Sequence, residues 1–392
     1  MIIKRNYNRP RSGTVIVGRQ KRKNIVCPSC GEGRRLWRKE KIAREVPHLQ
    51  ILDTPVIIRW EGYKYHCQDC GRYFREQFPG LLKRRRFTEV YRKEVFNLHK
   101  AGVSQVELSR LKGIGTATVE RWFKQLLERK NREYNSYSYP SHIGIDEHRF
   151  TRKVGFCTTI TDLSGHKVLD IYKGRSSQAI QAALKKIPGR KNVKMVAMDL
   201  SETYRKIVKD VFPQAIRVAD RFHVIRLINQ HFLSTWQHFD PENRKNRGLL
   251  SLMRRHEWHL DRSQAQALDR YLSTMPSLKS IYDFKQDLVR LLLKKRQTVR
   301  QCKQLIPQLI YMIQQLQKEQ LSPLVTLGNT LANWQGEIAA MWRFTKSNGI
   351  TEGFHRKMKL IQRRAYGFKN FENYRLRVRV LCGSMNLNSI LT

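Results

Sequence analysis

Acidic residues are scarce in this chain of 392 residues. Asp and Glu number 32 against 76 Lys and Arg, so the formal net charge is +44. Such a surplus of one sign repels itself unless a polyanion shares the surface, and nucleic acid is the expected partner. Hydrophobic residues at 40% and aromatic residues at 10% can build real cores, which excludes a wholly disordered chain. The length predicts about two to four domains.

Long apolar runs are also missing. The most apolar stretches, residues 288–293 and 305–313, are interrupted by Arg290 and Pro307 and are too short to cross a bilayer. The first residues are basic, and no apolar run of signal-peptide length follows them. We therefore expect a cytoplasmic protein that has no membrane partner.

Cysteine is infrequent, and its placement argues against a disulfide framework. There are seven cysteines, an odd number, and two Cys-x-x-Cys pairs account for four of them. In a chain without an export signal, such pairs predict metal ligands. Two residues between the thiolates let both sulfurs face one tetrahedral Zn²⁺, and the glycine after each pair permits a tight turn. We expect a structural zinc ion held by four thiolates: Cys27, Cys30, Cys67 and Cys70.

Two alternatives stay open for this group. His66 or His48 could replace one of the cysteines, or the four residues could be ordinary reduced thiols. The three remaining cysteines lie outside the pattern and are expected to be small buried hydrophobic residues: Cys157, Cys302 and Cys382.

The first part of the chain contains segments of different composition. Residues 1–24 are basic, contain Pro and Gly and lack periodicity, so we expect a flexible arm. Residues 25–82 carry the cysteine pairs among short β-like runs, which predicts a zinc-binding ribbon. Residues 83–130 have a helical pattern, and the polar stretch 131–141 predicts a linker.

The helical segment has the pattern of a helix-turn-helix. Ser104 can cap a short helix, with Glu107 at the capping-box position, and a turn with two glycines follows at 112–115. A second helix would begin at Thr116 and bury three residues on its inner face: Val119, Trp122 and Phe123. Its outer face would offer four side chains to a DNA groove: Thr116, Thr118, Arg121 and Lys124. A small helical bundle that does not contact DNA is the alternative.

From residue 142 onward the pattern predicts a mixed α/β sheet. Three β-rich runs, 143–150, 154–163 and 167–174, are separated by turn-like pieces and read as antiparallel strands. Helix-like and strand-like segments then alternate, as in two βα units. Residues 221–345 are charged and helical in pattern, with no convincing strand.

Because acids are rare, those at strand ends are informative. Asp146 lies in the first predicted strand of this sheet, and Asp199 ends its most apolar strand, where α/β proteins collect ligands. Two Mg²⁺ ions about 4 Å apart activate an attacking oxygen and stabilise a leaving oxygen in phosphoryl transfer. A third acid is needed to hold both ions.

Glu352 is the candidate for the third acid. A helix from Ile350 would place its apolar residues on one side and Glu352 on the other. Three basic residues share the side of Glu352 and could track a DNA backbone: Arg356, Lys359 and Arg363. A lone acid on a basic stripe makes sense as a metal ligand, whereas an i,i+4 ion pair from Glu352 to Arg356 is the alternative.

Asp220 and His223 are auxiliary candidates. Asp220 follows the last predicted strand, so it could be a further metal ligand or simply the N-cap of the next helix. His223 could orient a phosphate, or it could pack against its neighbours at the start of that helix.

In their order along the chain, these pieces resemble the bacterial insertion-sequence transposases of the DDE type, specifically the ISL3 group. The resemblance covers nearly the whole chain. It is carried by the cysteine module, the helix-turn-helix and four further segments: Gly144-Ile145-Asp146-Glu147, Asp199 with Tyr204, Asp220-Arg221-Phe222-His223, and Ser347-Asn348 through Thr351-Glu352-Gly353 to Arg363-Arg364-Ala365-Tyr366-Gly367.

The resemblance implies a multidomain α+β fold with a zinc ribbon, a helix-turn-helix domain and a ribonuclease-H-like α/β catalytic domain. The catalytic domain would consist of residues 142–224 and 346–392, interrupted by an all-helical insertion, residues 225–345. The metal-binding triad that the resemblance implies is Asp146, Asp199 and Glu352.

The predicted function is that of a nucleoid-associated DNA transposase. It would bind the ends of its element, cut them with two Mg²⁺ ions, and join the 3′ hydroxyls to target DNA. Joining two ends requires two active sites, so we expect a homodimer on double-stranded DNA. The alternative is a catalytically inert, sequence-specific DNA-binding regulator that keeps the sheet as a scaffold, and a simple nuclease is a third possibility.

Overall fold

The structure is a computed structural model. It describes residues 2–6, 13–18, 25–31, 33, 35–50, 56–77, 86–134, 138–152, 154–174, 177–344 and 349–383. The chain forms two compact units, Met1–Arg129 and Lys130–Thr392, and each is described by itself. No helix in these described ranges is long and apolar enough to cross a membrane.

The first unit begins with a sheet built on a long hairpin. Strands β3 (Leu36–Pro47) and β4 (Val56–Cys67) are antiparallel, and the register pairs Leu36 with Cys67. The start of β3 therefore lies beside the end of β4, which brings the two cysteine pairs together across the sequence. The short strand β5 (Tyr73–Arg75) adds to β4 beyond the second pair.

Strands also form within residues 1–24. β1 (Ile2–Asn6) pairs with β2 (Gly13–Gly18), and β2 pairs in parallel with β4. Our prediction of a flexible arm is therefore wrong for these two stretches, and the other residues of 1–24 lie outside the described ranges. Short β-branched runs such as Val15-Ile16-Val17 become strands because an existing strand offers them a partner, which periodicity alone does not reveal.

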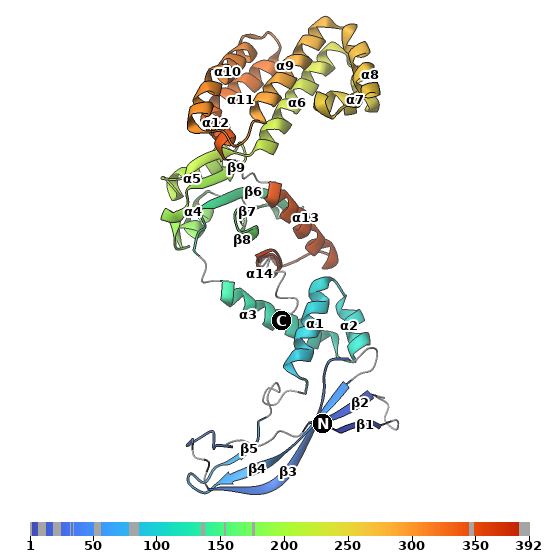
Figure 1. The fold of residues 1–392 in the computed structure, drawn as a ribbon, viewed down its shortest axis with the longest axis vertical. Helices are drawn as coiled ribbons and strands as arrows, with labels where there is room; N and C mark the ends of the chain where they lie inside the picture. Colours follow the sequence, from blue (N-terminus) through green and yellow to red (C-terminus); the bar gives the residue numbers. More distant parts are fainter. Residues whose placement is uncertain are drawn as a thin grey trace. The chain divides into compact units, whose positions relative to one another are not determined.

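Three helices complete the first unit (Figure 1). They are α1 (Glu89–Ala101), α2 (Gln105–Lys112) and α3 (Thr116–Tyr134). Ser104 caps α2 as predicted, accepting a hydrogen bond from the backbone N–H of Glu107 at 3.1 Å. Gly113, in the turn that follows, has a φ of +62°, a conformation that favours glycine. The predicted inner face of α3 is confirmed, because Val119, Trp122 and Phe123 are buried.

The predicted linker 131–141 is partly structured. α3 continues to Tyr134, so the prediction is wrong for residues 131–134, and residues 135–137 lie outside the described ranges. Tyr139 is buried and packs edge-on against Phe212, with 5.0 Å between the ring centroids. Its hydroxyl donates to the carbonyl oxygen of Leu184 at 3.2 Å, so this segment is anchored inside the second unit, to which it belongs.

The second unit is built around a mixed five-stranded sheet in the order β10-β9-β6-β7-β8. β6, β7 and β8 are antiparallel neighbours, whereas β9 and β10 run parallel to β6. This confirms the prediction of three antiparallel strands followed by two βα units. The strands and the two linking helices are β6 (His142–Thr151), β7 (Gly155–Asp162), β8 (Lys167–Lys173), α4 (Ser177–Lys185), β9 (Met195–Met198), α5 (Glu202–Val211) and β10 (Ile216–Ala219).

Helices alone fill the described chain between β10 and Phe344, as predicted. Figure 1 shows them gathered in one block near the strand labelled β9. The α-helices of this block are α6 (Arg221–Phe239), α7 (Arg247–Arg254), α8 (Arg262–Ser273), α9 (Pro276–Leu292), α10 (Val299–Lys318), α11 (Ser322–Asn333) and α12 (Gln335–Arg343). Their apolar core continues into that of the sheet, which makes the block part of the same unit.

Two last helices return to the sheet. α13 (Gly349–Arg364) and α14 (Phe371–Gly383) share a second apolar core with β6, β7 and β8. Phe354, Met358 and Ile361 of α13 are buried there, as the predicted apolar face requires. Cys157 and Cys382 are fully buried in the same core, which confirms our expectation for them, while Cys302 of α10 is half-buried.

Candidate active site and zinc centre

The four predicted cysteine ligands come together in the first unit. Sγ of Cys27 lies 3.6 Å from Sγ of Cys70, and Sγ of Cys30 lies 3.7 Å from Sγ of Cys67. All four sulfurs are within 4.8 Å of one another. A tetrahedral Zn²⁺ with bonds of about 2.3 Å separates its sulfur ligands by about 3.8 Å, so the geometry fits a structural zinc ion.

Both cysteine pairs have the backbone of a metal-binding turn. Gly31 and Gly71, the residues after the pairs, have φ values of +77° and +68°. The backbone N–H of Cys30 hydrogen-bonds the sulfur of Cys27 and lowers the pKa of that thiol to about 7, which favours the thiolate that zinc requires. The histidine alternatives are not part of the cluster. His48 hydrogen-bonds Thr88 at 2.9 Å, and His66 stacks on Tyr73.

A row of three aspartates crosses the sheet of the second unit. The register pairs Ile145 of β6 with Met198 of β9, and Met198 with Ala219 of β10. The next residue along each of these parallel strands is an aspartate: Asp146, Asp199 and Asp220. The register thus brings the three carboxylates to one level at the carboxyl ends of β9 and β10, the edge where α/β sheets bind ligands.

His223, from the first turn of α6, lies between two of these carboxylates. Its Nδ1 atom is 2.7 Å from Asp220 Oδ2 and 2.9 Å from Asp199 Oδ1. Nδ1 carries one hydrogen, which Asp220 accepts. Asp199 Oδ1 is buried and accepts no hydrogen bond within the described part of the chain. The positive group beside this oxygen is the His223 ring itself, and a carboxylate oxygen in this position is suited to a cation.

The electrostatics of the row also favour a cation. Burial and the neighbouring Asp199 raise the pKa of Asp146 to about 8. Burial lowers the pKa of His223, but the two aspartates outweigh this and raise it to about 10, so His223 is cationic at neutral pH. Asp146, Asp199 and His223 can place one ligand atom each within 4.8 Å of the others. Carboxylate oxygens are the ligands that Mg²⁺ prefers.

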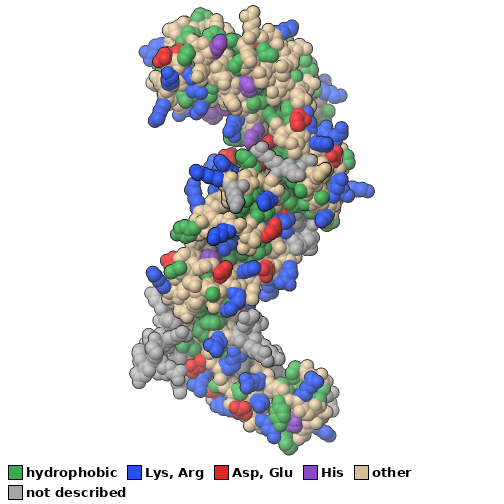
Figure 2. All heavy atoms as spheres, turned by 180° about the vertical axis from the view of Figure 1, so that it is seen from behind, with side chains coloured by type: hydrophobic (Ala, Val, Ile, Leu, Met, Phe, Trp, Pro, Cys, Tyr) green, Lys and Arg blue, Asp and Glu red, His purple; other side chains and the backbone are tan. Residues whose placement is uncertain are grey.

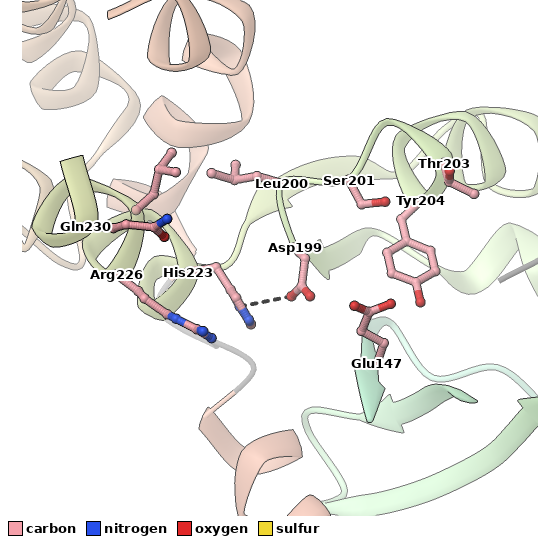
Figure 3. A pocket seen from close by; sticks show the side chains of 10 residues that line it. Glu147, Asp199, Leu200, Ser201, Thr203, Tyr204, His223, Arg226 and Gln230 are labelled. Carbon is pink, nitrogen blue, oxygen red and sulfur yellow. Dashed lines mark ion pairs between the residues drawn. The ribbon is translucent and has the colours of Figure 1, made fainter. Parts of the chain in front are cut away.

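An open pocket of about 420 Å³ adjoins the row. Figure 3 shows Glu147 and Asp199 pointing toward the same space, with Tyr204 beside them and Arg226 on the side of His223. The hydroxyl of Tyr204 lies 3.0 Å from Thr158 Oγ1, which fixes the ring at the wall of the pocket. The pocket is wide enough for a piece of a polar substrate and carries one arginine that could meet a phosphate.

Glu352 lies on α13 outside this cluster. Its carboxylate is about half exposed, and Oε1 accepts a hydrogen bond from Arg356 at 3.2 Å, which is the ion pair that we considered as its alternative role. The rest of the predicted basic stripe, Arg356, Lys359 and Arg363, is exposed along the same helix. The predicted DNA-facing residues of α3 are mostly exposed: Thr116, Arg121 and Lys124. Thr118 is half-buried, and its Oγ1 accepts a hydrogen bond from Arg121 Nη2 at 3.4 Å.

Several residues near Asp146 were not predicted from the sequence. His355, one turn after Glu352, places Nδ1 3.7 Å from Asp146 Oδ2. His148, Thr159 and Tyr374 continue from His355 as a buried polar chain. One signal was available, because His148 stands two residues after Asp146 and His355 three after Glu352, but the partners come from distant parts of the sequence.

Comparison with known proteins finds similarity to transposases in both units of the chain. Residues 143–378 match a family of the ISL3 type described as transposase, and residues 23–70 match the zinc finger of the transposases of IS204, IS1001, IS1096 and IS1165. The chain is 26% identical over 369 residues to the transposase for insertion sequence element IS1001 of Bordetella parapertussis, an alignment that covers 91% of this chain and 88% of that protein.

These matches confirm the resemblance and the zinc module. The transposase match alone spans more than half of the chain, and it contains the whole aspartate row, all of α13 and α14 as far as Val378. The chain belongs to the ISL3 family of insertion-sequence transposases.

Proposed function

We propose that the protein cuts the ends of an insertion sequence and joins the freed 3′ hydroxyls to target DNA, using two Mg²⁺ ions held by Asp146, Asp199 and Glu352. The observation that carries this proposal is the aspartate row, in which the buried Asp199 Oδ1 faces the imidazole of His223 and accepts no aligned hydrogen bond within the described residues. When bound, the two ions would activate the attacking oxygen and stabilise the leaving one. The proposal includes a ribonuclease-H-like catalytic domain of residues 142–224 and 346–392, with the helices of 225–345 as an insertion.

The third ligand requires a change of partner for Glu352. Its ion pair with Arg356 is exposed, and such pairs contribute about 0–1 kcal/mol, so the exchange for a divalent cation costs little. The helix is already anchored beside Asp146, because Thr351 and His355 both reach β7. Residues three apart share one face of a helix, and His355 Nδ1 is 3.7 Å from Asp146 Oδ2. Glu352 therefore stands one turn from a contact with the aspartate row.

Asp220 and His223 support the same site without being part of the triad. Asp220 occupies the N-cap position of α6, but its side chain binds His223 instead of capping the helix. It thus holds a protonated imidazole at the edge of the row. A positive side chain there can orient a phosphate of the DNA, and Arg226, on the next turn of α6, extends the positive charge into the pocket.

The proposed DNA contacts lie outside the pocket as well. We assign α2 and α3 to a helix-turn-helix whose exposed face, Thr116, Thr118, Arg121 and Lys124, reads the element ends. The stripe Arg356, Lys359 and Arg363 would contact the backbone next to the cut. Figure 2 shows Lys and Arg side chains spread over the visible face, on the helical block as well as around the sheet. Contacts of this kind make binding steeply salt-dependent.

The test is a cleavage-and-joining assay with the DNA that flanks the gene, in Mg²⁺ and in EDTA. The proposal expects cleaved ends and joined products in Mg²⁺ alone, formed by a homodimer on the DNA, and a loss of both activities of at least about a thousandfold in Asp199→Ala. Cleavage without joining would show a nuclease. End binding without any cleavage would show the regulator, which the transposase relatives do not favour.

A further inference from the structure

A buried chain of polar side chains connects Asp146 to the last helix of the structure. It crosses from α14 through β6 and β7 to α13, and its members are each at most 9% exposed. Starting at the far end, the members are Tyr374, His148, Thr159 and His355. Nothing in the proposed chemistry uses these residues directly, and two imidazoles are costly groups to bury for the sake of packing alone.

The contacts run in one line. Tyr374 Oη lies 2.9 Å from His148 Nε2, and His148 Nδ1 lies 3.0 Å from Thr159 Oγ1. Thr159 Oγ1 is also 3.2 Å from His355 Nε2. The other nitrogen of His355, Nδ1, is 3.7 Å from Asp146 Oδ2, an ion-pair distance. A movement of the carboxylate by about 1 Å, as when it turns to bind a cation, makes the last contact a hydrogen bond.

The protonation state of Asp146 determines which atom donates and which accepts in each of these hydrogen bonds. A carboxylate that binds a metal is ionised and can only accept, so His355 Nδ1 must carry the hydrogen that faces it. His355 Nε2 then accepts from the hydroxyl of Thr159, which accepts from His148 Nδ1. His148 Nε2 in turn accepts from the hydroxyl of Tyr374. In this arrangement each of the four side chains donates once, and both histidines are neutral.

We propose that Tyr374, His148 and Thr159 act through His355 as positioning residues, which fix the carboxylate of Asp146 for metal binding. This inference rests on the proposed function, because it assumes a metal at Asp146. If the proposal holds, α14 helps to position the metal-binding carboxylate, although Tyr374 lies 226 residues from His148 in the sequence.

A neighbouring hydrogen bond provides a control that distinguishes the positioning of Asp146 from the docking of α13 on the sheet. Thr161, two residues after Thr159 on β7, bonds Thr351 of α13 at 2.8 Å. Both threonines are fully buried, and both hold α13 through a side-chain hydrogen bond. Only Thr159 belongs to the line that ends at Asp146. Thr159→Val and Thr161→Val therefore each remove a buried hydroxyl that hydrogen-bonds α13, and they differ in the connection to the carboxylate.

The experiment measures Mn²⁺ binding to the full-length, zinc-loaded protein by electron paramagnetic resonance, with thermal unfolding alongside. We expect Thr159→Val to weaken Asp199-dependent Mn²⁺ binding about tenfold or more, and Thr161→Val to change it less than about twofold at a similar loss of stability. Tyr374→Phe, which keeps the ring packed on Phe150, should weaken binding at least about threefold. Its matched control is Tyr282→Phe, a buried tyrosine of α9 that is not part of the line.

The outcomes distinguish this inference from the proposed function. If Asp199→Asn abolishes Mn²⁺ binding, while Thr159→Val matches Thr161→Val and Tyr374→Phe matches Tyr282→Phe, the metal site stands and the positioning role is wrong. If Asp199→Asn leaves the Mn²⁺ signal of the wild-type protein unchanged, the metal site itself is wrong, and the positioning role falls with it.

Discussion

His223 Nδ1 lies 2.9 Å from Asp199 Oδ1, so a protonated imidazole stands beside the strand-end carboxylates where a divalent cation is expected. Its raised pKa, about 10, shows how strongly these carboxylates attract positive charge in a buried setting. The metal-free site is therefore electrostatically costly, and the cost falls mainly on Asp146, whose pKa is raised to about 8. Strongly perturbed pKa values of this kind cluster at functional sites, although structural ion pairs also produce them.

Asp146→Asn should stabilise the metal-free protein while abolishing DNA cleavage. Asn keeps the oxygen that accepts from the backbone N–H of Glu147 and removes the buried charge. Because the pKa of Asp146 is raised in the folded state, the wild-type protein loses stability as the pH rises from about 4 to about 8, and the variant does not. We expect a gain of at least about 1 kcal/mol at pH 7 in EDTA, measured by thermal unfolding. An unchanged or lower melting temperature would contradict the raised pKa.

Loss of zinc should disable the first unit and spare the second. Cys27→Ser removes one of four ligands, and structural zinc sites contribute directly to folding. We expect less than one zinc per chain, loss of binding to the element ends, and an unchanged thermal transition of residues 130–392. Cys302→Ser, a half-buried cysteine of α10, is the control and should keep the zinc content at one. Full zinc content in Cys27→Ser would exclude the four-cysteine site.

Arg121→Ala and Lys124→Ala should both weaken binding to the element ends, because both side chains are exposed on α3. If Arg121 reads a base, its loss costs about 1–3 kcal/mol and reduces the preference for the element ends. If Lys124 contacts a phosphate, its loss lowers the salt dependence by about one unit and affects all sequences equally. Lys303→Ala, on α10, serves as the control in fluorescence anisotropy titrations. Wild-type affinity in both α3 variants would refute the helix-turn-helix assignment.

Glu337 should matter for stability because it anchors the helical block to the sheet. Its carboxylate is buried. Oε2 accepts a hydrogen bond from Arg205 Nη2 at 2.9 Å, and Oε1 accepts from Arg205 Nε at 3.1 Å and from Arg217 Nε at 3.3 Å. Glu337→Gln leaves two arginines facing a neutral group, which should cost about 2–4 kcal/mol in urea unfolding. Glu202 pairs with the same Arg205 but is exposed, so Glu202→Gln should cost less than about 1 kcal/mol. Equal costs would mean that the anchor contributes no more than a surface pair.

Lys285→Met should stabilise the protein at neutral pH. Lys285 is buried on α9, where it donates to the carbonyl oxygen of Met253, and burial lowers its pKa from 10.5 to about 8. The unfolded chain holds this proton more tightly, so the wild-type protein carries a penalty of up to about 3 kcal/mol below pH 8, which disappears as the pH rises toward 10.5. The gain in melting temperature should therefore shrink from pH 7 to pH 9.5. Lys279→Met changes a partly exposed lysine of the same helix and should show neither effect.

The features that the sequence predicted well are those with a local signature. These features are the two Cys-x-x-Cys pairs, the cap at Ser104, the strand that contains Asp146 and the strand that ends before Asp199, and they depend on short spacings and on period-two patterns. The aspartate row follows from them once β6, β9 and β10 are parallel, because residues at equivalent register positions become neighbours.

The remaining features depend on contacts between distant segments. Part of a basic, aperiodic stretch forms a strand because β2 pairs with β4, and no local sequence pattern predicts this pairing. The line from Tyr374 to His355 joins four elements whose residues are up to 226 positions apart. Helix geometry placed Glu352 on the basic face of α13 but could not decide between a metal and Arg356 as its partner, since both satisfy the same carboxylate.

The most direct test of the account is anomalous diffraction from crystals of the protein bound to an element end in Mn²⁺. We predict two manganese peaks about 4 Å apart, in contact with the carboxylates of Asp146, Asp199 and Glu352. Glu352 should then have left Arg356. A manganese-soaked complex without a peak at the aspartate row, or with Glu352 still paired to Arg356, would contradict the proposed catalytic site.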